Sequence, residues 1–144
     1  MARKSAGILL YRKKNSNFEF FLVHPGGPFW LKKDLGVWSI PKGEFIDEKP
    51  EVAARREFFE ETGIKFPDDL MPLSPQKLKS SKVVHGFAAE GDFEAYRLRS
   101  NRTKFGWPEV DRGEWFDLET AQQKINQGQV GFILELTKKL QSKG

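Results

Sequence analysis

Three glutamates near the middle of the chain constrain it most. Glu57, Glu60 and Glu61 are spaced i, i+3 and i+4, which places their side chains on one face of an α-helix with neighbouring Cβ atoms about 5–6 Å apart. Carboxylates this close repel one another, by roughly 4 kcal/mol for a pair at 4 Å in an effective dielectric near 20. A hard, oxygen-seeking cation such as Mg²⁺ or Mn²⁺ would convert that repulsion into binding energy. The spacing therefore predicts a metal-binding helix face.

An ordinary surface helix is the competing interpretation. Acidic clusters on helices are usually solvated, and Arg56 could form a simple i, i+4 ion pair with Glu60. Two glycines favour the functional interpretation, because Gly43 precedes the helix and Gly63 stands where the helix should end.

The segment from residue 43 to residue 64 reads GEFIDEKPEVAARREFFEETGI. It resembles the Nudix box, the signature of hydrolases that act on nucleoside diphosphates linked to another group. Residues 56–64 match the second half of the family pattern at every specified position, and Glu48 lies at the required distance before Arg56. The difference lies in front of the helix, where only four residues separate Gly43 from Glu48, one fewer than in the family.

The apolar pattern predicts an α+β fold for one domain covering residues 1–144. Strands are expected at residues 6–11, 18–23, 36–40, 76–89 (as two strands or one bent strand), 94–99 and 113–116. The glutamate helix should begin at Pro50 with Lys49 as its N-cap and end at Gly63. Further helices are expected from Asp117 to about residue 126 and over roughly 132–141. The resemblance implies that these elements form a Nudix-type α/β/α sandwich with a mixed β-sheet.

Composition narrows the class of protein. Thirty-eight per cent hydrophobic residues, with 13 Phe and 4 Trp, argue for a folded globule, and the lack of cysteine excludes disulfides and thiolate chemistry. The apolar run at residues 7–11 is too short for a signal peptide or a membrane span, so a cytoplasmic protein without a membrane partner is expected. A net charge of +4 would attract a polyphosphate. RNA would also be attracted, but no RNA-binding motif is present, and nothing indicates an oligomeric state.

The resemblance implies a role for each acidic position of the helix. Glu57 and Glu61 are the expected principal ligands of Mg²⁺ or Mn²⁺, and Glu60 would assist them or act on water. Gly43 would offer its backbone carbonyl to the metal. Arg56 would orient a catalytic glutamate, and Glu48 would be either an outer ligand or a capping group.

Residues outside the box complete the predicted site. Pro108-Glu109-Val110-Asp111 is followed by Trp115, and family members often have a glutamate at the position of Glu109 that approaches the metals from a loop. Trp38-Ser39-Ile40-Pro41-Lys42-Gly43 resembles the lead-in of Nudix enzymes that cleave dinucleoside polyphosphates or diphosphoinositol polyphosphates. Lys42, Trp38 and His24 are accordingly the predicted substrate-binding residues.

The predicted reaction is hydrolysis of a P–O–P bond by metal-activated water, without a covalent intermediate. The first hypothesis is cleavage of a dinucleoside polyphosphate such as diadenosine tetraphosphate. The second is an RNA 5′-pyrophosphohydrolase or a nucleoside-triphosphate pyrophosphatase. A third, of another class, is a catalytically silent domain that senses a nucleotide or binds a partner; three crowded carboxylates argue against it, since a silent domain has no electrostatic reason to retain them.

Overall fold

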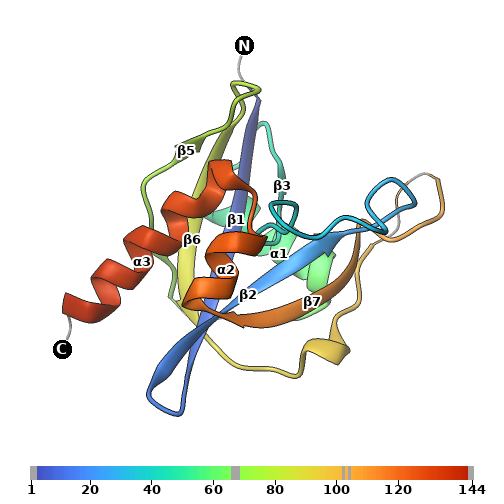
Figure 1. The fold of residues 1–144 in the computed structure, drawn as a ribbon. Coiled ribbons are helices and arrows are strands. Elements are labelled where there is room, and N and C mark those ends of the chain that lie inside the picture. Colours follow the sequence, from blue (N-terminus) through green and yellow to red (C-terminus); the bar gives the residue numbers. More distant parts are fainter. Residues whose placement is uncertain (1–2, 66–68, 102, 104, 143–144) are drawn as a thin grey trace.

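The computed structural model describes residues 3–65, 69–101, 103 and 105–142. In chain order the elements are β1 (Lys4–Lys14), β2 (Asn17–Pro25), β3 (Lys42–Glu44), α1 (Pro50–Thr62), β4 (Met71–Pro72), β5 (Gln76–Lys77), β6 (Val83–Glu90), the 3₁₀ turn η1 (Ala95–Arg97), β7 (Val110–Asp117), α2 (Leu118–Lys124), the 3₁₀ turn η2 (Gln127–Gln129) and α3 (Val130–Ser142). Figure 1 shows a twisted sheet with helix α1 on one side and the two C-terminal helices, α2 and α3, on the other.

The sheet is mixed. Its main path runs β4-β6-β1-β2-β7, with β3 paired to β1 and β5 paired to β6. β1 and β6 run parallel, whereas β1 and β2 form an antiparallel hairpin. The tight turn of that hairpin uses Asn15 and Ser16 at positive φ, a conformation that asparagine tolerates better than most residues. β1 therefore lies at the centre of the sheet, where side chains on both faces are covered.

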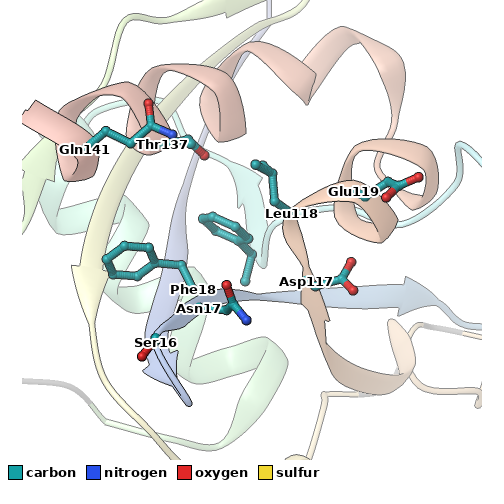
Figure 2. Close-up of a pocket in the computed structure, with 9 residues that line it drawn as sticks. Ser16, Asn17, Phe18, Asp117, Leu118, Glu119, Thr137 and Gln141 are labelled. Atoms are coloured by element: carbon teal, nitrogen blue, oxygen red, sulfur yellow. The ribbon is translucent and has the colours of Figure 1, made fainter.

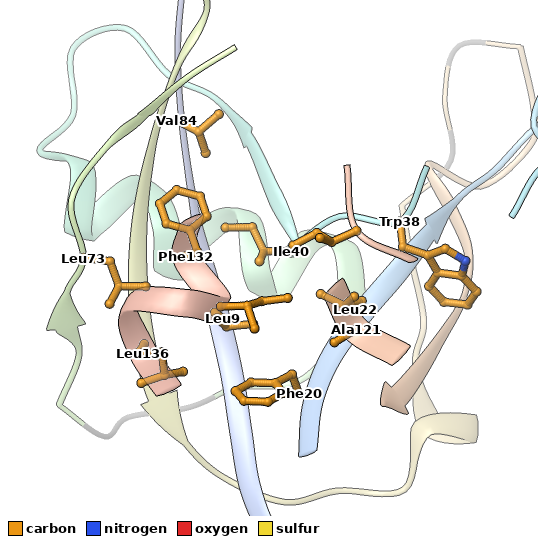
Figure 3. Packing of buried hydrophobic residues seen from close by; sticks show 13 residues of the cluster. Leu9, Phe20, Leu22, Trp38, Ile40, Leu73, Val84, Ala121, Phe132 and Leu136 are labelled. Carbon is orange, nitrogen blue, oxygen red and sulfur yellow. The ribbon is translucent and has the colours of Figure 1, made fainter. Parts of the chain in front are cut away.

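Helices cover both faces of the sheet (Figure 1). Alternate residues of β1 point to opposite faces: Ile8 belongs to the apolar cluster that includes Phe58 of α1, while Leu9 belongs to the cluster that includes Phe132 of α3. Figure 3 shows this second cluster, in which Leu136 and Phe132 of α3 pack over the sheet. The predicted α/β/α sandwich with a mixed sheet is confirmed. No helix among the described residues has the length and apolar content needed to cross a membrane.

Most of the predicted elements are confirmed. α1 begins at Pro50 and ends at Gly63, whose φ of 75° is the left-handed conformation expected of a glycine cap. Asp117 caps α2 by accepting a hydrogen bond from the Thr120 amide at 2.8 Å. The last helix begins at Val130, slightly earlier than predicted.

Three strand predictions need correction. Residues 36–40 make only isolated bridges, at Ser39 to β2 and at Trp38 to Ile125, because their backbone groups are divided between two partners. The segment 94–99 contains the 3₁₀ turn η1 instead of a strand, and Leu98 packs against the α1-side cluster as an irregular segment. The strand predicted at 113–116 is longer, since β7 begins at Val110.

The contact between β6 and α3 generates a stability prediction. A Cβ built on Gly86 would lie 2.5 Å from Cε1 of Phe132, so Gly86→Ala should overpack the core and lower the free energy of unfolding by about 1–3 kcal/mol. Denaturant titration of Gly86→Ala, Phe132→Leu and the double variant measures the effect. Because Phe132→Leu frees the space that the new methyl needs, the combined loss should be smaller than the sum of the two single losses. Simple additivity would contradict the contact.

Candidate metal and catalytic site

Helix α1 turns its acidic face inward. Ala53, Ala54 and Phe58 are fully buried in the core, and Glu57 and Glu61, on the neighbouring part of the helix surface, are only 7% and 8% exposed. Charged carboxylates are seldom buried this deeply unless a partner compensates them. The arrangement does not fit the ordinary solvated helix face that was the competing interpretation.

Strand β3 covers the two buried carboxylates. The Lys42 amide donates a hydrogen bond to Oε1 of Glu61 at 3.2 Å. A Cβ at residue 43 would overlap the carboxylate of Glu57, so only glycine allows the backbone to approach this closely. The lead-in to the helix and the helix itself thus meet at Gly43, where the sequence predicted a metal contact.

Arg56 connects the remaining glutamates. Its guanidinium makes three bonds to Glu48, from Nε to Oε1 at 3.2 Å and to Oε2 at 2.9 Å, and from Nη2 to Oε1 at 2.5 Å. Nη1 donates to Glu57 at 2.6 Å and to Glu60 at 3.1 Å. The bonds to Glu48 are the largest cause of the raised pKa of Arg56. This geometry supports an orienting role for Arg56, and it places Glu48 as the group that holds the guanidinium in position.

The site has the electrostatics of a cation site. Burial raises the pKa of Glu61 to about 8, and burial followed by repulsion from Glu60 raises the pKa of both Glu57 and Glu109. These shifts mean that nearby positive charge does not fully compensate the carboxylates. A divalent cation would do so, with oxygen ligands from the glutamates and from the Gly43 carbonyl.

The carboxylates of α1 suit a divalent cation chemically, but they are not yet arranged as a complete set of metal ligands. Within the described part of the chain, no three acidic or histidine side chains already converge as a metal-binding group. Instead, the guanidinium of Arg56 bridges Glu57 and Glu60. A cation bound to these oxygens would therefore share them with Arg56 or displace it.

Glu109 faces the buried carboxylates across a small cleft. The cleft has a volume of about 160 Å³ and is lined by Lys42, Glu61 and Glu109, with Pro25 and Val110 among its apolar walls. The Glu109 amide donates to the Asn101 carbonyl at 2.8 Å, and the Asn101 amide donates to the Glu60 carbonyl at 2.9 Å. This chain of backbone hydrogen bonds ties Glu109, which directly precedes β7, to the end of α1, while the catalytic role expected of Glu109 stays a prediction.

Lys42 brings a positively charged side chain to the cleft. Its pKa is lowered, first by burial and next by repulsion from Lys82, although Glu61 and Glu44 oppose the change. A partly buried ammonium beside a cleft is well suited to contact a phosphate oxygen.

A larger hollow lies elsewhere on the molecule and does not share this chemistry. It measures about 530 Å³ and lies between the β1–β2 turn, the start of α2 and the end of α3 (Figure 2). The residues that line it include Phe18, Thr137 and the acidic Asp117 and Glu119, and no lysine or arginine is among these described lining residues. The described lining of the larger hollow therefore offers no ammonium or guanidinium for a phosphate, whereas Lys42 lines the smaller cleft, which favours the smaller cleft as the reactive site.

Trp38 and His24 are not placed as substrate contacts, and this part of the prediction is corrected. Trp38 is 1% exposed, donates from Nε1 to Asp34 at 2.8 Å and packs edge-on against His24. His24 is 0% exposed, with Nδ1 paired to Asp111 at 3.0 Å and Nε2 donating to the Lys33 carbonyl at 2.7 Å. Both rings are satisfied in the interior, where they support the segments around the cleft.

The sequence interpretation also missed a polar contact beside the cleft, between Gln129, which does not line the cleft, and Ser39, which does. Gln129 is 2% exposed and bonds to the amide of Ile40 and the hydroxyl of Ser39. No local pattern indicated this contact, because about ninety residues separate the partners in the chain.

Comparison with known proteins gives consistent results. The NUDIX domain profile matches residues 1–136. An RNA pyrophosphohydrolase of Bartonella henselae is 26% identical over 146 residues, covering 82% of this chain and 78% of the relative. A solved structure of C. elegans Ap4A hydrolase is 25% identical with a TM-score of 0.63, covering 97% and 99% of the two chains. The NUDIX domain of Shewanella oneidensis NrtR, complexed with ADP ribose, is 18% identical with a TM-score of 0.71, covering 97% and 89%.

Cation binding should be visible in the melting temperature. Mg²⁺ should raise the melting temperature by mass action on the native state, since about 2.7 kcal/mol is gained at a concentration 100 times the Kd. Glu57→Gln should weaken this gain because it removes a charge with almost no change in volume. Gly43→Ala should weaken it as well, because the new methyl pushes the Glu57 carboxylate aside. Differential scanning fluorimetry with and without Mg²⁺ measures both, and an unchanged gain in both variants would contradict the site.

Proposed function

Because the chain belongs to the NUDIX domain family, we propose that it is a divalent-metal-dependent pyrophosphohydrolase that acts on a dinucleoside polyphosphate such as diadenosine tetraphosphate. The observation that carries the proposal is the meeting of the buried Glu61, the loop residue Glu109 and Lys42 in one cleft. Glu57 lies beside them at the Gly43 backbone. The cleft thus combines oxygen ligands for a cation with an ammonium for phosphate.

The glutamates of α1 and the Gly43 backbone would hold the metal ion. Glu57, Glu61 and the Gly43 carbonyl, assisted by Glu60, are the proposed ligands of Mg²⁺ or Mn²⁺. When bound, such an ion lowers the pKa of a coordinated water and screens the phosphate oxygens.

Proton transfer and positioning fall to the other side chains of the site. Arg56 holds the carboxylates of Glu57 and Glu60 at 2.6 and 3.1 Å. Glu109, whose pKa is raised by burial, accepts the proton of the attacking water, and Glu60 is the second candidate for that role. Lys42 places its ammonium near the phosphate chain.

Two observations support a dinucleoside polyphosphate. The segment from Trp38 to Gly43 resembles the lead-in of enzymes with such substrates, and Lys42 of that segment lines the cleft. The C. elegans Ap4A hydrolase shares the fold over nearly its whole length. Because Trp38 is buried, the support from the lead-in rests on Lys42.

An RNA 5′-pyrophosphohydrolase is the second candidate. The likeness to the Bartonella henselae RNA pyrophosphohydrolase favours it, as does the net charge of +4, which would attract a long polyanion. Product analysis after incubation with dinucleoside polyphosphates, nucleoside triphosphates and 5′-triphosphate RNA separates the candidates, since the first would yield two mononucleotides and the others a monophosphate end and pyrophosphate. No metal-dependent turnover of any of them would favour the silent nucleotide-sensing domain.

Glu109 should act on the chemical step. Glu109→Gln should lower kcat by about 10²–10⁴-fold, the usual contribution of a general base, with a much smaller change in KM. Glu114→Gln is the matched control, because Glu114 lies on β7 but is half exposed and pairs with Arg112 at 3.6 Å, outside the cleft. Steady-state kinetics measures both. If Glu109→Gln alters only thermal stability, Glu109 is structural and Glu60 becomes the expected base.

The position of the broken bond tests the substrate. Diadenosine tetraphosphate should yield ATP and AMP in place of two ADP, because a site that fixes one nucleotide end relative to the metal determines which phosphorus the water reaches. Hydrolysis in ¹⁸O-labelled water followed by mass spectrometry identifies the product that carries the new oxygen. Two ADP, or no cleavage together with rapid attack on triphosphate RNA, would favour the second candidate.

Lys42 should matter most for long substrates. Lys42→Ala should raise KM mainly for substrates with more phosphates, since the ammonium of Lys42 would contact the phosphates of the substrate that do not react. Lys32→Ala, which removes an exposed lysine beyond β2, is the matched control and should have little effect. Equal effects of the two variants would reduce Lys42 to a contributor to the overall positive field.

A further inference from the structure

The segment that leads into the cation site is held from behind by the C-terminal part of the chain. Residues 123–129, here called the C-terminal strap, run beside residues 36–40. The Gly36 amide donates to the Gln123 carbonyl at 3.1 Å and the Trp38 amide to the Lys124 carbonyl at 3.0 Å, while the Trp38 carbonyl accepts from the Asn126 amide at 2.7 Å. Gln129, the last residue of the strap, contacts residues 39 and 40 through its side chain.

Gln129 is a buried amide whose two ends are both engaged. Its side-chain oxygen accepts from the Ile40 amide at 3.1 Å, and its side-chain nitrogen donates to the Ser39 hydroxyl at 3.0 Å. The Ser39 hydroxyl in turn donates to the Ile40 carbonyl at 2.6 Å. At 2% exposure, the amide would lose free energy if either bond were missing. Residues 39 and 40 are therefore fixed to one position against the strap.

From Ile40 the chain reaches the carboxylates within three residues. The Pro41 carbonyl accepts from the Ile8 amide of β1 at 3.2 Å, and the Lys42 amide bonds to Glu61 at 3.2 Å. Gly43 follows, with its Cα against the Glu57 carboxylate. A shift of Ile40 would thus be passed along a short segment, one of whose residues is a proline of fixed φ, to both buried glutamates.

We propose that Gln129 is a positioning residue for the cation site, acting through residues 39–42 on the Lys42 amide and the Gly43 carbonyl; the assignment rests on the proposed function of that site. Gln129 does not line the cleft, so its effect is on the affinity and placement of the cation, and through these on the chemical step. The substrate's own contacts with Lys42 and the surrounding surface are left largely intact.

The test compares Gln129→Met with Gln127→Met. Methionine has a similar size but cannot make either hydrogen bond. Gln127 is the matched control, because its side-chain nitrogen bonds only to the carbonyls of Gln122 and Ile125 within the same C-terminal part of the chain. Mn²⁺ binding is followed by electron paramagnetic resonance without substrate, and kcat and KM are measured separately on the substrate that the panel identifies.

Gln129→Met should weaken Mn²⁺ binding on the order of tenfold, as expected for the loss of one or two net hydrogen bonds. It should lower kcat with little change in KM, while Gln127→Met should match the parent in all three quantities. Equal Mn²⁺ affinity and kcat in Gln129→Met and the parent, with only the melting temperature lowered, would overturn the proposal because Gln129 would then be merely structural.

Gln129→Asn serves as a second variant if Gln129→Met does not fold, whereas Ser39→Ala would not, because Ser39 itself lines the cleft. Asparagine keeps the amide but is one methylene shorter, so it cannot hold both bonds and should reduce Mn²⁺ affinity in the same direction by a smaller factor; unchanged affinity there would also overturn the proposal. The Mn²⁺ measurement needs no turnover. A parent protein that binds Mn²⁺ but hydrolyses nothing would contradict the proposed function while still deciding the role of Gln129.

Discussion

The rest of the site depends on the burial of two carboxylates beneath one strand. Glu57 and Glu61 are less than a tenth exposed, and β3 crosses directly over them. Burying two like charges in one place is unfavourable unless a positive charge joins them. Residue 43 is confined to glycine by the space that the Glu57 carboxylate takes. The local fold thus maintains an electrostatic cost that cation binding would relieve.

Arg56 makes this arrangement tolerable in the protein without a bound cation. A fixed guanidinium that bridges Glu57 and Glu60, held in turn by Glu48, supplies positive charge where two carboxylates approach each other. The hydrogen bonds described for Arg56 go to Glu48, Glu57 and Glu60, and not to Glu61 or Glu109. Burial raises the pKa of Glu61 and of Glu109. The two carboxyl groups that Arg56 does not contact therefore lie on the cleft side, where a cation and a phosphate would meet. The shorter loop between Gly43 and Glu48 is compatible with this geometry, since both carboxylate oxygens of Glu48 still accept hydrogen bonds from Arg56.

Local sequence patterns predicted the parts of this structure that local interactions determine. The i, i+3, i+4 spacing placed the glutamates, Pro50 and Gly63 marked the ends of α1, and the polar turn between apolar runs marked the β1–β2 hairpin. Residues 36–40 were misread as a strand because their partners, β2 on one side and the strap on the other, are distant in sequence. For the same reason no pattern showed that His24 would be satisfied by Asp111, 87 residues away, or that Gln129 would reach Ile40.

The size of the cleft explains why the box alone does not determine the substrate. At about 160 Å³, the cleft lies below the roughly 300–1,000 Å³ of pockets that enclose a drug-sized ligand. A cleft of this size would hold only the reacting phosphates, so under the proposed function the remainder of a dinucleotide or an RNA would lie on the surface beyond them. That surface includes the segment after β2 and the segment before β7, which meet where the Gly26 amide donates to the Glu109 carbonyl at 2.9 Å and where Trp107 packs on Gly27. Because Glu109 belongs to one of these segments, a substrate that contacted them would also contact the backbone that carries the proposed base. Under the proposed function, selection of the substrate and the rate of its hydrolysis would be coupled through these backbone contacts.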